Sequence, residues 1–155
     1  MEDRLFRDAM GKFATGVTVI TTEIENEVHG MTANAFMSVS LDPKLISISI
    51  DERAGMHGKL KHSGKFAVNI LSEKQQDISM HFAGQKKENR EINFDWLKET
   101  PVIKDSLVTI VCNVYSTHKA GDHTLFIGEV IHVETNEDHP LTFYKGQYGL
   151  ETSHV

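Results

Sequence analysis

The segment from residue 29 to residue 50 contains the most constraining pattern in the chain. From Leu45 to Ile50, isoleucine occupies every second position and serine fills two of the positions between. A period of two is typical of a half-buried β-strand and argues against a helix here. The preceding residues 30–35 have little apolar bulk, and their small side chains leave backbone N–H and C=O groups accessible. They suit either a turn-rich start of a strand or a segment that hydrogen-bonds to a flat ring with polar edges.

Strand signals recur through the rest of the sequence. Runs of β-branched and apolar residues predict strands at 17–22, 66–71, 107–115, 125–133 and 141–145. We expect the connection between the two longest strands at 119–123. Strands outnumber helices and no regular alternation of strand and helix occurs, so we expect a mainly β fold: an antiparallel barrel with peripheral helices.

Three helices are expected around this barrel. Apolar residues at steps of one, four, five and eight predict an amphipathic helix over 3–14 that packs by one face. A short helix within 51–63 is expected to end at Gly64, and the capping box Ser72–Gln75 begins another. We interpret 84–100 as a polar excursion with a short helix, mobile at 85–90.

Composition excludes several classes of protein. A chain of 155 residues with 39% hydrophobic content suits one domain spanning 1–155. A net charge of −6 argues against nucleic acid as a partner, and no segment is apolar enough for a signal peptide or a membrane span. Cys112 is the single cysteine, which excludes an intrachain disulfide and favours a buried thiol in a cytoplasmic protein. Nine histidines occur without metal-ligand spacing, so no metal site is expected.

Five motifs in order give the chain a family resemblance. They are HGMTANA with SVSLDP at 29–43, GKFAVNIL at 64–71, FAG at 82–84, GDHTLFIGEV at 121–130 and PLTFYKGQY at 140–148. Together they resemble the flavin reductase family with the FMN-binding split-barrel fold, a Greek-key barrel. These proteins are the reductase components of two-component flavin monooxygenases. The resemblance implies hydride transfer from NAD(P)H to FMN, with FAD possible, and a homodimer that supplies reduced flavin to a monooxygenase or another acceptor.

The resemblance also assigns roles to residues near the central segment. Thr32, Ala33, Asn34 and Ala35 match the segment along the isoalloxazine edge, and Ser49, Ile50 and Asp51 match the stretch beside the ribityl chain. The family then usually has a Ser/Thr-rich turn for the phosphate, but residues 53–57 here contain no hydroxyl. Arg53 and the N–H groups that begin the following helix are the remaining candidates, with an ordinary exposed arginine as the alternative.

Further candidate site residues lie downstream. Phe82, Ala83, Gly84 and Lys86 match a second loop on the phosphate side. The alternative for Lys86 and Lys87 is a solvated pair of charges, which is the favoured interpretation of Lys87. His123 is a candidate catalytic residue that contacts the nicotinamide or stabilises charge near the flavin, the alternative being a histidine that orders the turn. Tyr148 matches an aromatic residue near the active site, with packing between subunits as the alternative.

Two functions from different classes fit these features. The first is an NAD(P)H:flavin oxidoreductase, in which the protein positions two rings without a covalent intermediate. No Gly-x-Gly-x-x-Gly motif occurs, so a Rossmann domain is not expected to hold the nicotinamide. The second is an FMN-binding carrier or sensor that does not turn over NAD(P)H. For the homodimer, the candidate surface residues are Phe36, Met37, Trp96 and Phe143.

Overall fold

A curled antiparallel sheet forms the body of the protein. The computed structural model describes residues 1–84 and 91–150. Seven strands lie in the order β3-β2-β6-β9-β10-β5-β4, and every neighbouring pair is antiparallel. They are β2 (Thr18–Ile24), β3 (Glu27–Ala33), β4 (Phe36–Leu41), β5 (Lys44–Asp51), β6 (Lys65–Ile70), β9 (Val108–Ala120) and β10 (His123–Thr135). The mainly β antiparallel barrel expected from the sequence is therefore confirmed.

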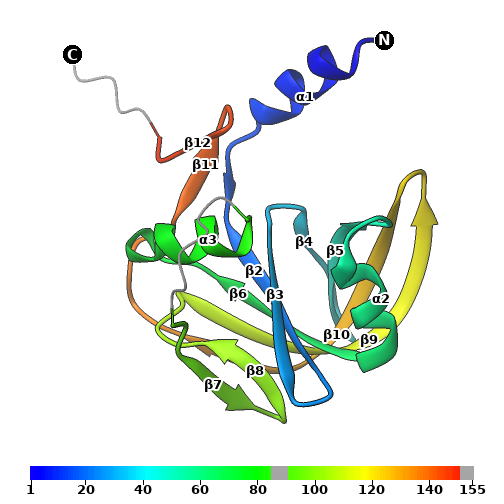
Figure 1. Ribbon diagram of the computed structural model, residues 1–155, viewed down its shortest axis with the longest axis vertical. Coiled ribbons are helices and arrows are strands. Elements are labelled where there is room, and N and C mark those ends of the chain that lie inside the picture. Colours follow the sequence, from blue (N-terminus) through cyan, green and yellow to red (C-terminus); the bar gives the residue numbers. More distant parts are fainter. Residues whose placement is uncertain (85–90, 151–155) are drawn as a thin grey trace.

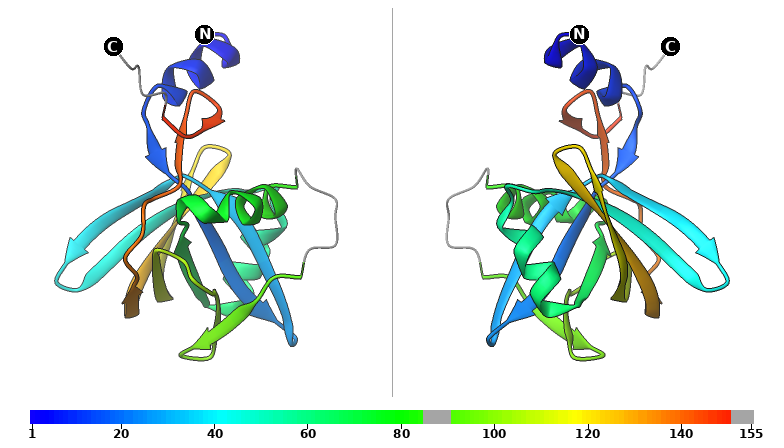
Figure 2. Two further views of the ribbon diagram at one scale, coloured as in Figure 1. Left: turned by 90° about the vertical axis from the view of Figure 1, so that its left-hand side faces the viewer. Right: turned by 90° about the vertical axis from the view of Figure 1, so that its right-hand side faces the viewer.

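The barrel is closed at one end and split at the other. Its two edge strands, β3 and β4, are consecutive in the chain and are joined only by Asn34 and Ala35. This short connection holds the edges together, while the β4–β5 hairpin diverges from β2–β3 at the far end (Figure 2). The connection between the edge strands, here called the β3–β4 corner, is also the segment that the sequence associates with a flavin ring.

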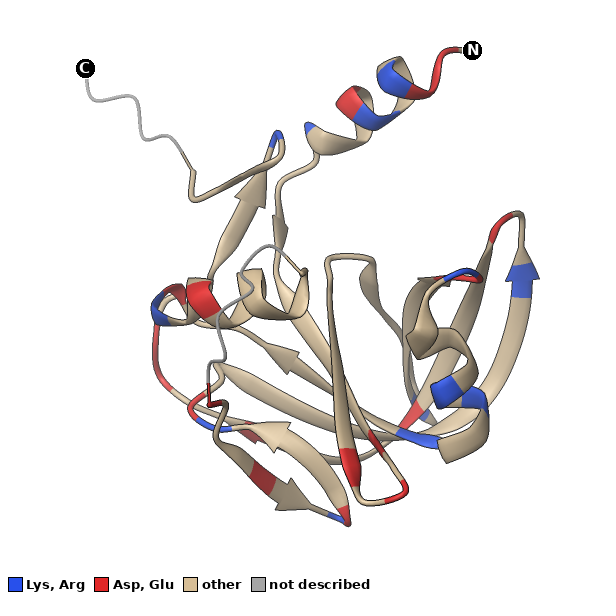
Figure 3. Ribbon diagram, in the orientation of Figure 1, with Lys and Arg blue, Asp and Glu red and all other residues tan. Residues whose placement is uncertain are grey.

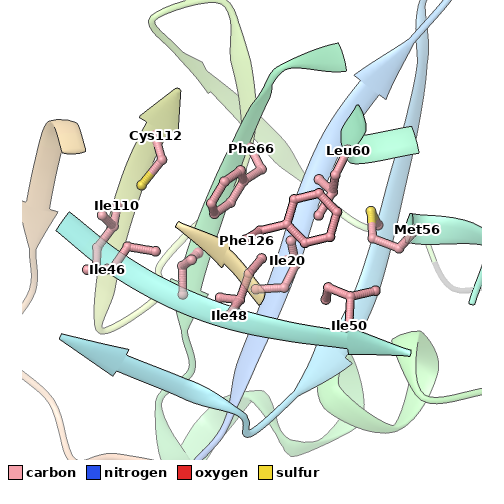
Figure 4. Close-up of a cluster of buried hydrophobic side chains, with 11 residues drawn as sticks. Ile20, Ile46, Ile48, Ile50, Met56, Leu60, Phe66, Ile110, Cys112 and Phe126 are labelled. Atoms are coloured by element: carbon pink, nitrogen blue, oxygen red, sulfur yellow. The ribbon is translucent and has the colours of Figure 1, made fainter. Parts of the chain in front are cut away.

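Alternating isoleucines of β5 point into the barrel, as the sequence pattern predicts. Ile46, Ile48 and Ile50 are buried and pack with Phe66 of β6 and Phe126 of β10 (Figure 4). Helix α2 (Gly55–Ser63) adds Met56 and Leu60 to the same core. Gly64 ends α2 in the left-handed region at φ 71°, a conformation that glycine adopts without steric cost. The predicted helix and its stop are confirmed.

A second apolar cluster lies on the other face of β2. Its buried members are Val17, Val19, Leu71, Ile103 and Leu141, and partly buried residues of α3 (Gln76–Phe82) pack against it. The capping box at Ser72 and Gln75 is present and begins the short 3-10 helix η1 (Glu73–Gln75) that leads into α3. Cys112 is fully buried in the barrel core, and burial raises the pKa of its thiol to about 12.

Small elements lie at both ends of the barrel. The sheet β1 (Thr15–Gly16), β11 (Thr142–Tyr144) and β12 (Gln147–Tyr148) lies at the same end as α1 (Asp3–Gly11), as Figure 1 shows. The hairpin β7 (Phe94–Leu97) and β8 (Thr100–Ile103) lies at the opposite end. No helix among residues 1–84 and 91–150 is long and apolar enough to span a membrane.

Three expectations about local structure are wrong. The helix expected within 84–100 is absent from residues 91–100, where β7 pairs with β8 because Phe94 and Leu97 pack against clusters beneath the hairpin. The expected connection at 119–123 is mostly strand, and only Gly121 and Asp122 separate β9 from β10. Helix α1 forms, but none of its residues is buried. The mobility expected at 85–90 falls outside the described residues.

Candidate functional site

The β3–β4 corner offers backbone N–H groups at the closed end of the barrel. Its carbonyl oxygens are engaged: Asn34 accepts from the Phe36 N–H at 3.0 Å, and Ala35 accepts from the Ser49 N–H at 3.2 Å. Within the described part of the chain, the N–H groups of Asn34 and Ala35 have no hydrogen-bond acceptor. Held carbonyls and free N–H groups make the corner a rigid donor edge.

Two cavities flank this corner. The smaller, of about 170 Å³, is lined by Thr32, Ala33, Asn34, Ala83, Tyr148 and three further residues. The larger, of about 770 Å³, is here called the α1 cleft because helix α1 forms one of its walls. Asn34 and Phe143 line both cavities, so the corner lies between them.

The barrel wall of the α1 cleft brings together several residues that the sequence singles out. Asn34 and Ala35 of the corner, Ser49 of β5 and His123 of β10 all line it. Ile50 does not take part through its side chain, which is fully buried in the barrel core, so only its backbone remains available to a ligand. Within the predicted segment 49–51, Ser49 lines the cleft, Ile50 belongs to the core, and Asp51 supplies a carboxylate.

His123 begins β10 and is held by its neighbour in sequence. Its Nδ1 lies 2.7 Å from a carboxylate oxygen of Asp122, and 41% of its side chain is exposed. This hydrogen bond lowers the pKa of the Asp122 carboxyl. A carboxylate at this distance favours the proton on Nδ1 and fixes the ring, which leaves Nε2 for a ligand. In the sheet, His123 pairs directly with Asp51 of β5.

Asp51 captures Arg53 through two parallel hydrogen bonds. Arg53 Nε and Nη2 lie 3.2 Å and 3.0 Å from the two carboxylate oxygens, and the Arg53 backbone N–H donates to one of them at 2.8 Å. These hydrogen bonds from Arg53 lower the pKa of Asp51 to about 2. Arg53 lines neither cavity, and its side chain is 84% exposed. Its charge is thus already paired inside the protein.

Helix α3 and the hairpin β11–β12 meet at the smaller cavity. Ser79 Oγ and Tyr148 Oη are 2.7 Å apart, while the Ser79 carbonyl accepts a 2.6 Å hydrogen bond from Thr32. Ser79 therefore ties β12, α3 and β3 together around the smaller cavity. The sequence did not single out Ser79, because one serine in a helix carries no signal of a distant contact.

Phe82 contributes packing at this end of α3. Its ring lies against Gly30 of β3, where an added Cβ would approach ring carbons to 2.6 Å. Ala83 lines the smaller cavity and Gly84 follows with φ 75°. The candidate Lys86 lies outside the described residues.

The helix wall of the α1 cleft was missed as a site component. Phe6, Arg7, Met10, Gly11 and Phe13 line it, facing a cleft that also contains Phe143 and Gly146. The spacing of Phe6, Met10 and Phe13 is visible in the sequence, but it predicts packing of this face onto the barrel, and none of these residues is buried. The missing information is tertiary: α1 is joined to the C-terminal hairpin by the hydrogen bond from the Lys145 N–H to the Gly11 carbonyl, at 2.8 Å.

The described residues form neither a charged patch of one sign (Figure 3) nor a cluster of metal ligands. Acidic and basic residues are interspersed over the molecule (Figure 3). Across residues 1–84 and 91–150, no group of three or more His, Cys, Asp or Glu residues is placed to hold a metal ion. What the site does combine is a donor edge, small residues at the cleft and one fixed imidazole, which fits a flat ring whose edge accepts hydrogen bonds.

Comparison with known proteins agrees with this geometry. Residues 10–150 match the model of the flavin reductase like domain. The chain is 46% identical over 145 residues to an NADH-dependent flavin reductase of Rhodococcus sp, covering 92% of this chain and 82% of that protein. It is 37% identical to the reductase component of 4-hydroxyphenylacetate 3-monooxygenase of Thermus thermophilus, covering 90% and 89%. The solved structure of flavin reductase PheA2 in its native state superposes with a TM-score of 0.96 at 57% identity, covering 99% and 100%.

Proposed function

The chain belongs to the flavin reductase family, and from that premise we propose that it transfers hydride from NAD(P)H to FMN. The names of the Rhodococcus and Thermus relatives support a nicotinamide as the reductant and an oxygenase as the partner that receives the reduced flavin. A bound flavin supplies the hydride acceptor, and oxidation of one NAD(P)H with uptake of one proton gives the reduced form.

The observation that carries this proposal is the shared cleft. The donor edge at Asn34 and Ala35 and the imidazole of His123 line the same cavity, although they come from distant parts of the chain. Negative charge develops on the pyrimidine side of a flavin as it is reduced, and fixed N–H groups stabilise such charge without reorganising. The small side chains of Ala33 and Ala35 let a ring approach these groups.

His123 is assigned to the nicotinamide side of the reaction. With its Nδ1 hydrogen-bonded to Asp122, the ring presents Nε2 in one orientation. An interaction made with the second ring, or with charge that develops during transfer, accelerates the chemical step without tightening flavin binding.

The flavin is expected to exchange rather than remain bound, with FMN preferred to FAD. Support comes from the phosphate side, where residues 53–57 lack hydroxyl groups and Arg53 is engaged by Asp51. Loose binding fits an enzyme that releases reduced flavin to a separate oxygenase.

A steady-state assay tests the activity. NADH and NADPH are each offered with FMN, FAD and riboflavin, and oxidation is followed by nicotinamide absorbance. We expect turnover with FMN well above the uncatalysed background. Flavin binding without oxidation by any pair would instead establish an FMN carrier or sensor.

We further propose that the enzyme is a cytoplasmic homodimer and acts as one domain over 1–155. Met37 is 60% exposed and Trp96 is 50% exposed, and Val39 and Leu41 extend the apolar surface along β4. Phe36 and Phe143, which the sequence also suggested for this surface, are only partly exposed. A single copy has a mass of 17.4 kDa, so light scattering should give a mass near twice that value. A monomer at micromolar concentration would contradict the dimer.

The proposed cytoplasmic location is supported by the one buried cysteine, which suits a reducing compartment.

A further inference from the structure

Arg7 of helix α1 is a cation placed at the proposed reaction site. It lines the α1 cleft together with His123 and Ser49 of the barrel wall, and apolar residues of its own helix flank it. The neighbouring Arg4 differs: it lies 3.9 Å from Asp8 on the same helix and does not line the cleft. The two arginines thus have different surroundings within three residues.

Arg7 supplies a charge that the rest of the site lacks. Among the described residues lining the two cavities at the corner, Arg7 is the single lysine or arginine. It forms no ion pair or hydrogen bond with any residue in 1–84 or 91–150. A chain with net charge −6 repels anionic ligands at long range, so a nucleotide that enters the cleft needs a local cation.

We infer that Arg7 binds the diphosphate of the nicotinamide dinucleotide. This inference rests on the proposed function, in which the nicotinamide lies beside His123. A guanidinium pairs with phosphate oxygens through two parallel hydrogen bonds, and it is the side chain best suited to that group. The exposed rings of Phe6 and Phe13 then offer apolar contact to the second nucleoside of the same molecule.

The placement distinguishes this diphosphate from the flavin phosphate. Phe82, which the family resemblance associates with the flavin phosphate, and Arg53, the candidate that replaces the missing Ser/Thr-rich turn, do not line the α1 cleft. Arg7 lies on the opposite wall from Ser49, which belongs to the stretch expected beside the flavin chain. The nicotinamide dinucleotide is therefore the ligand whose phosphates Arg7 is placed to meet.

The test compares Arg7→Gln with Arg4→Gln, which removes the same charge from the same helix outside the cleft. Riboflavin serves as the acceptor, so that no flavin phosphate is present. We expect Arg7→Gln to raise the KM for NADH about three- to tenfold, between the usual effect of an exposed ion pair and that of a charge-assisted hydrogen bond, with kcat at saturating NADH within about twofold of wild type. Arg4→Gln should keep the wild-type KM. Arg7→Lys should recover part of the loss, and the KM of Arg7→Gln should depend less on salt than that of wild type.

Other outcomes overturn the inference in recognisable ways. An unchanged KM for NADH in Arg7→Gln removes Arg7 from dinucleotide binding. A fall in the ratio of FMN to riboflavin affinity, measured by flavin fluorescence, assigns Arg7 to the flavin phosphate instead. Equal changes in both arginine variants show a non-specific effect of net charge. A wild-type enzyme that oxidises no NADH with any flavin contradicts the proposed function itself, which is a separate result.

Discussion

The barrel side and the helix side of the α1 cleft satisfy their charges in opposite ways. On the barrel side, His123 in the cleft wall is held by Asp122, and Arg53, which does not line the cleft, is held by the carboxylate of Asp51 with two hydrogen bonds. On the helix side, Arg7 has no such partner within the described residues, and Phe6 and Met10 remain more than half exposed. The barrel wall is therefore organised before a ligand arrives, whereas the helix wall keeps groups that a ligand would satisfy.

This difference separates two tasks of a flavin reductase. A fixed wall suits the chemical step, since preorganised donors stabilise developing charge without rearrangement. An unsatisfied wall suits a co-substrate that must enter and leave at every turnover, because each of its contacts is made only while that molecule is bound. Substitutions on the two walls should therefore change different kinetic quantities.

The largest effect is expected on the barrel wall, at His123. His123→Ala should lower the rate of flavin reduction about tenfold to a hundredfold, the loss of one hydrogen bond made during hydride transfer, with FMN affinity nearly unchanged. Stopped-flow reduction at saturating FMN measures it. His118→Ala, on the adjoining strand β9, is the matched control. If FMN affinity and melting temperature fall together, His123 orders the turn; an unchanged reduction rate in a folded variant removes it from the mechanism.

The next largest effect is expected on stability, at the contact between Gly30 of β3 and Phe82 of α3. In Gly30→Ala the new methyl group meets the ring of Phe82, which packs against the second cluster, so the ring must shift. Overpacking of this kind costs about 1–3 kcal/mol of unfolding free energy. Urea denaturation measures the loss, with Gly58→Ala as control because no atom lies within 4 Å of its added Cβ. A neutral Gly30→Ala would show that α3 shifts freely over β3.

The same two walls explain which features the sequence could predict. The alternation of Ile46, Ile48 and Ile50 predicts β5 correctly because the residues that cover them belong to the same chain. The stripe of Phe6, Met10 and Phe13 predicts helix α1 equally well, but periodicity does not say what covers an apolar face. Here no part of the described chain buries it, so the expectation of inward packing is wrong.

Among the site residues, too, those that belong to a local motif are predictable and those placed by long-range contacts are not. The segment 32–35 and His123 are recognisable as short motifs, and the structure brings Asn34, Ala35 and His123 to one cleft. Arg7 has no motif of its own and reaches the cleft only through the position of α1, a long-range feature. Phe94, Trp96 and Leu97 lie at spacings that a helix or a strand can use, so the hairpin there depends on packing that the sequence does not display.

A smaller effect is expected from Arg53, and it tests the comparison directly. Arg53→Ala should weaken FMN more than riboflavin only if the guanidinium reaches the phosphate while bound to Asp51. We expect a loss of about threefold for FMN, smaller than for an unpaired cation, since the charge is already shared. Fluorescence titration with both flavins measures it, and equal losses for both would show that Arg53 does not contact the phosphate. A loss larger than the KM change in Arg7→Gln would reverse the expected contrast between the paired Arg53 and the unpaired Arg7.

The smallest effect concerns the Asp51–Arg53 pair and its dependence on pH. Arg53 lowers the pKa of Asp51 from 3.8 to about 2, so the folded protein holds this proton less tightly than the unfolded chain. The pair therefore stabilises the fold fully above pH 3.8, and that contribution disappears as the pH falls to about 2. Asp51→Asn should be slightly less stable than wild type at pH 7, and the difference should shrink between pH 4 and about pH 2. Chemical denaturation across this range measures it, with Asp95→Asn on β7 as an exposed carboxylate outside the pair. A difference that stays constant down to about pH 2 would mean that Asp51 is not held by Arg53 in solution, and Arg53 on the barrel side would then be an unpaired cation as Arg7 is on the helix side.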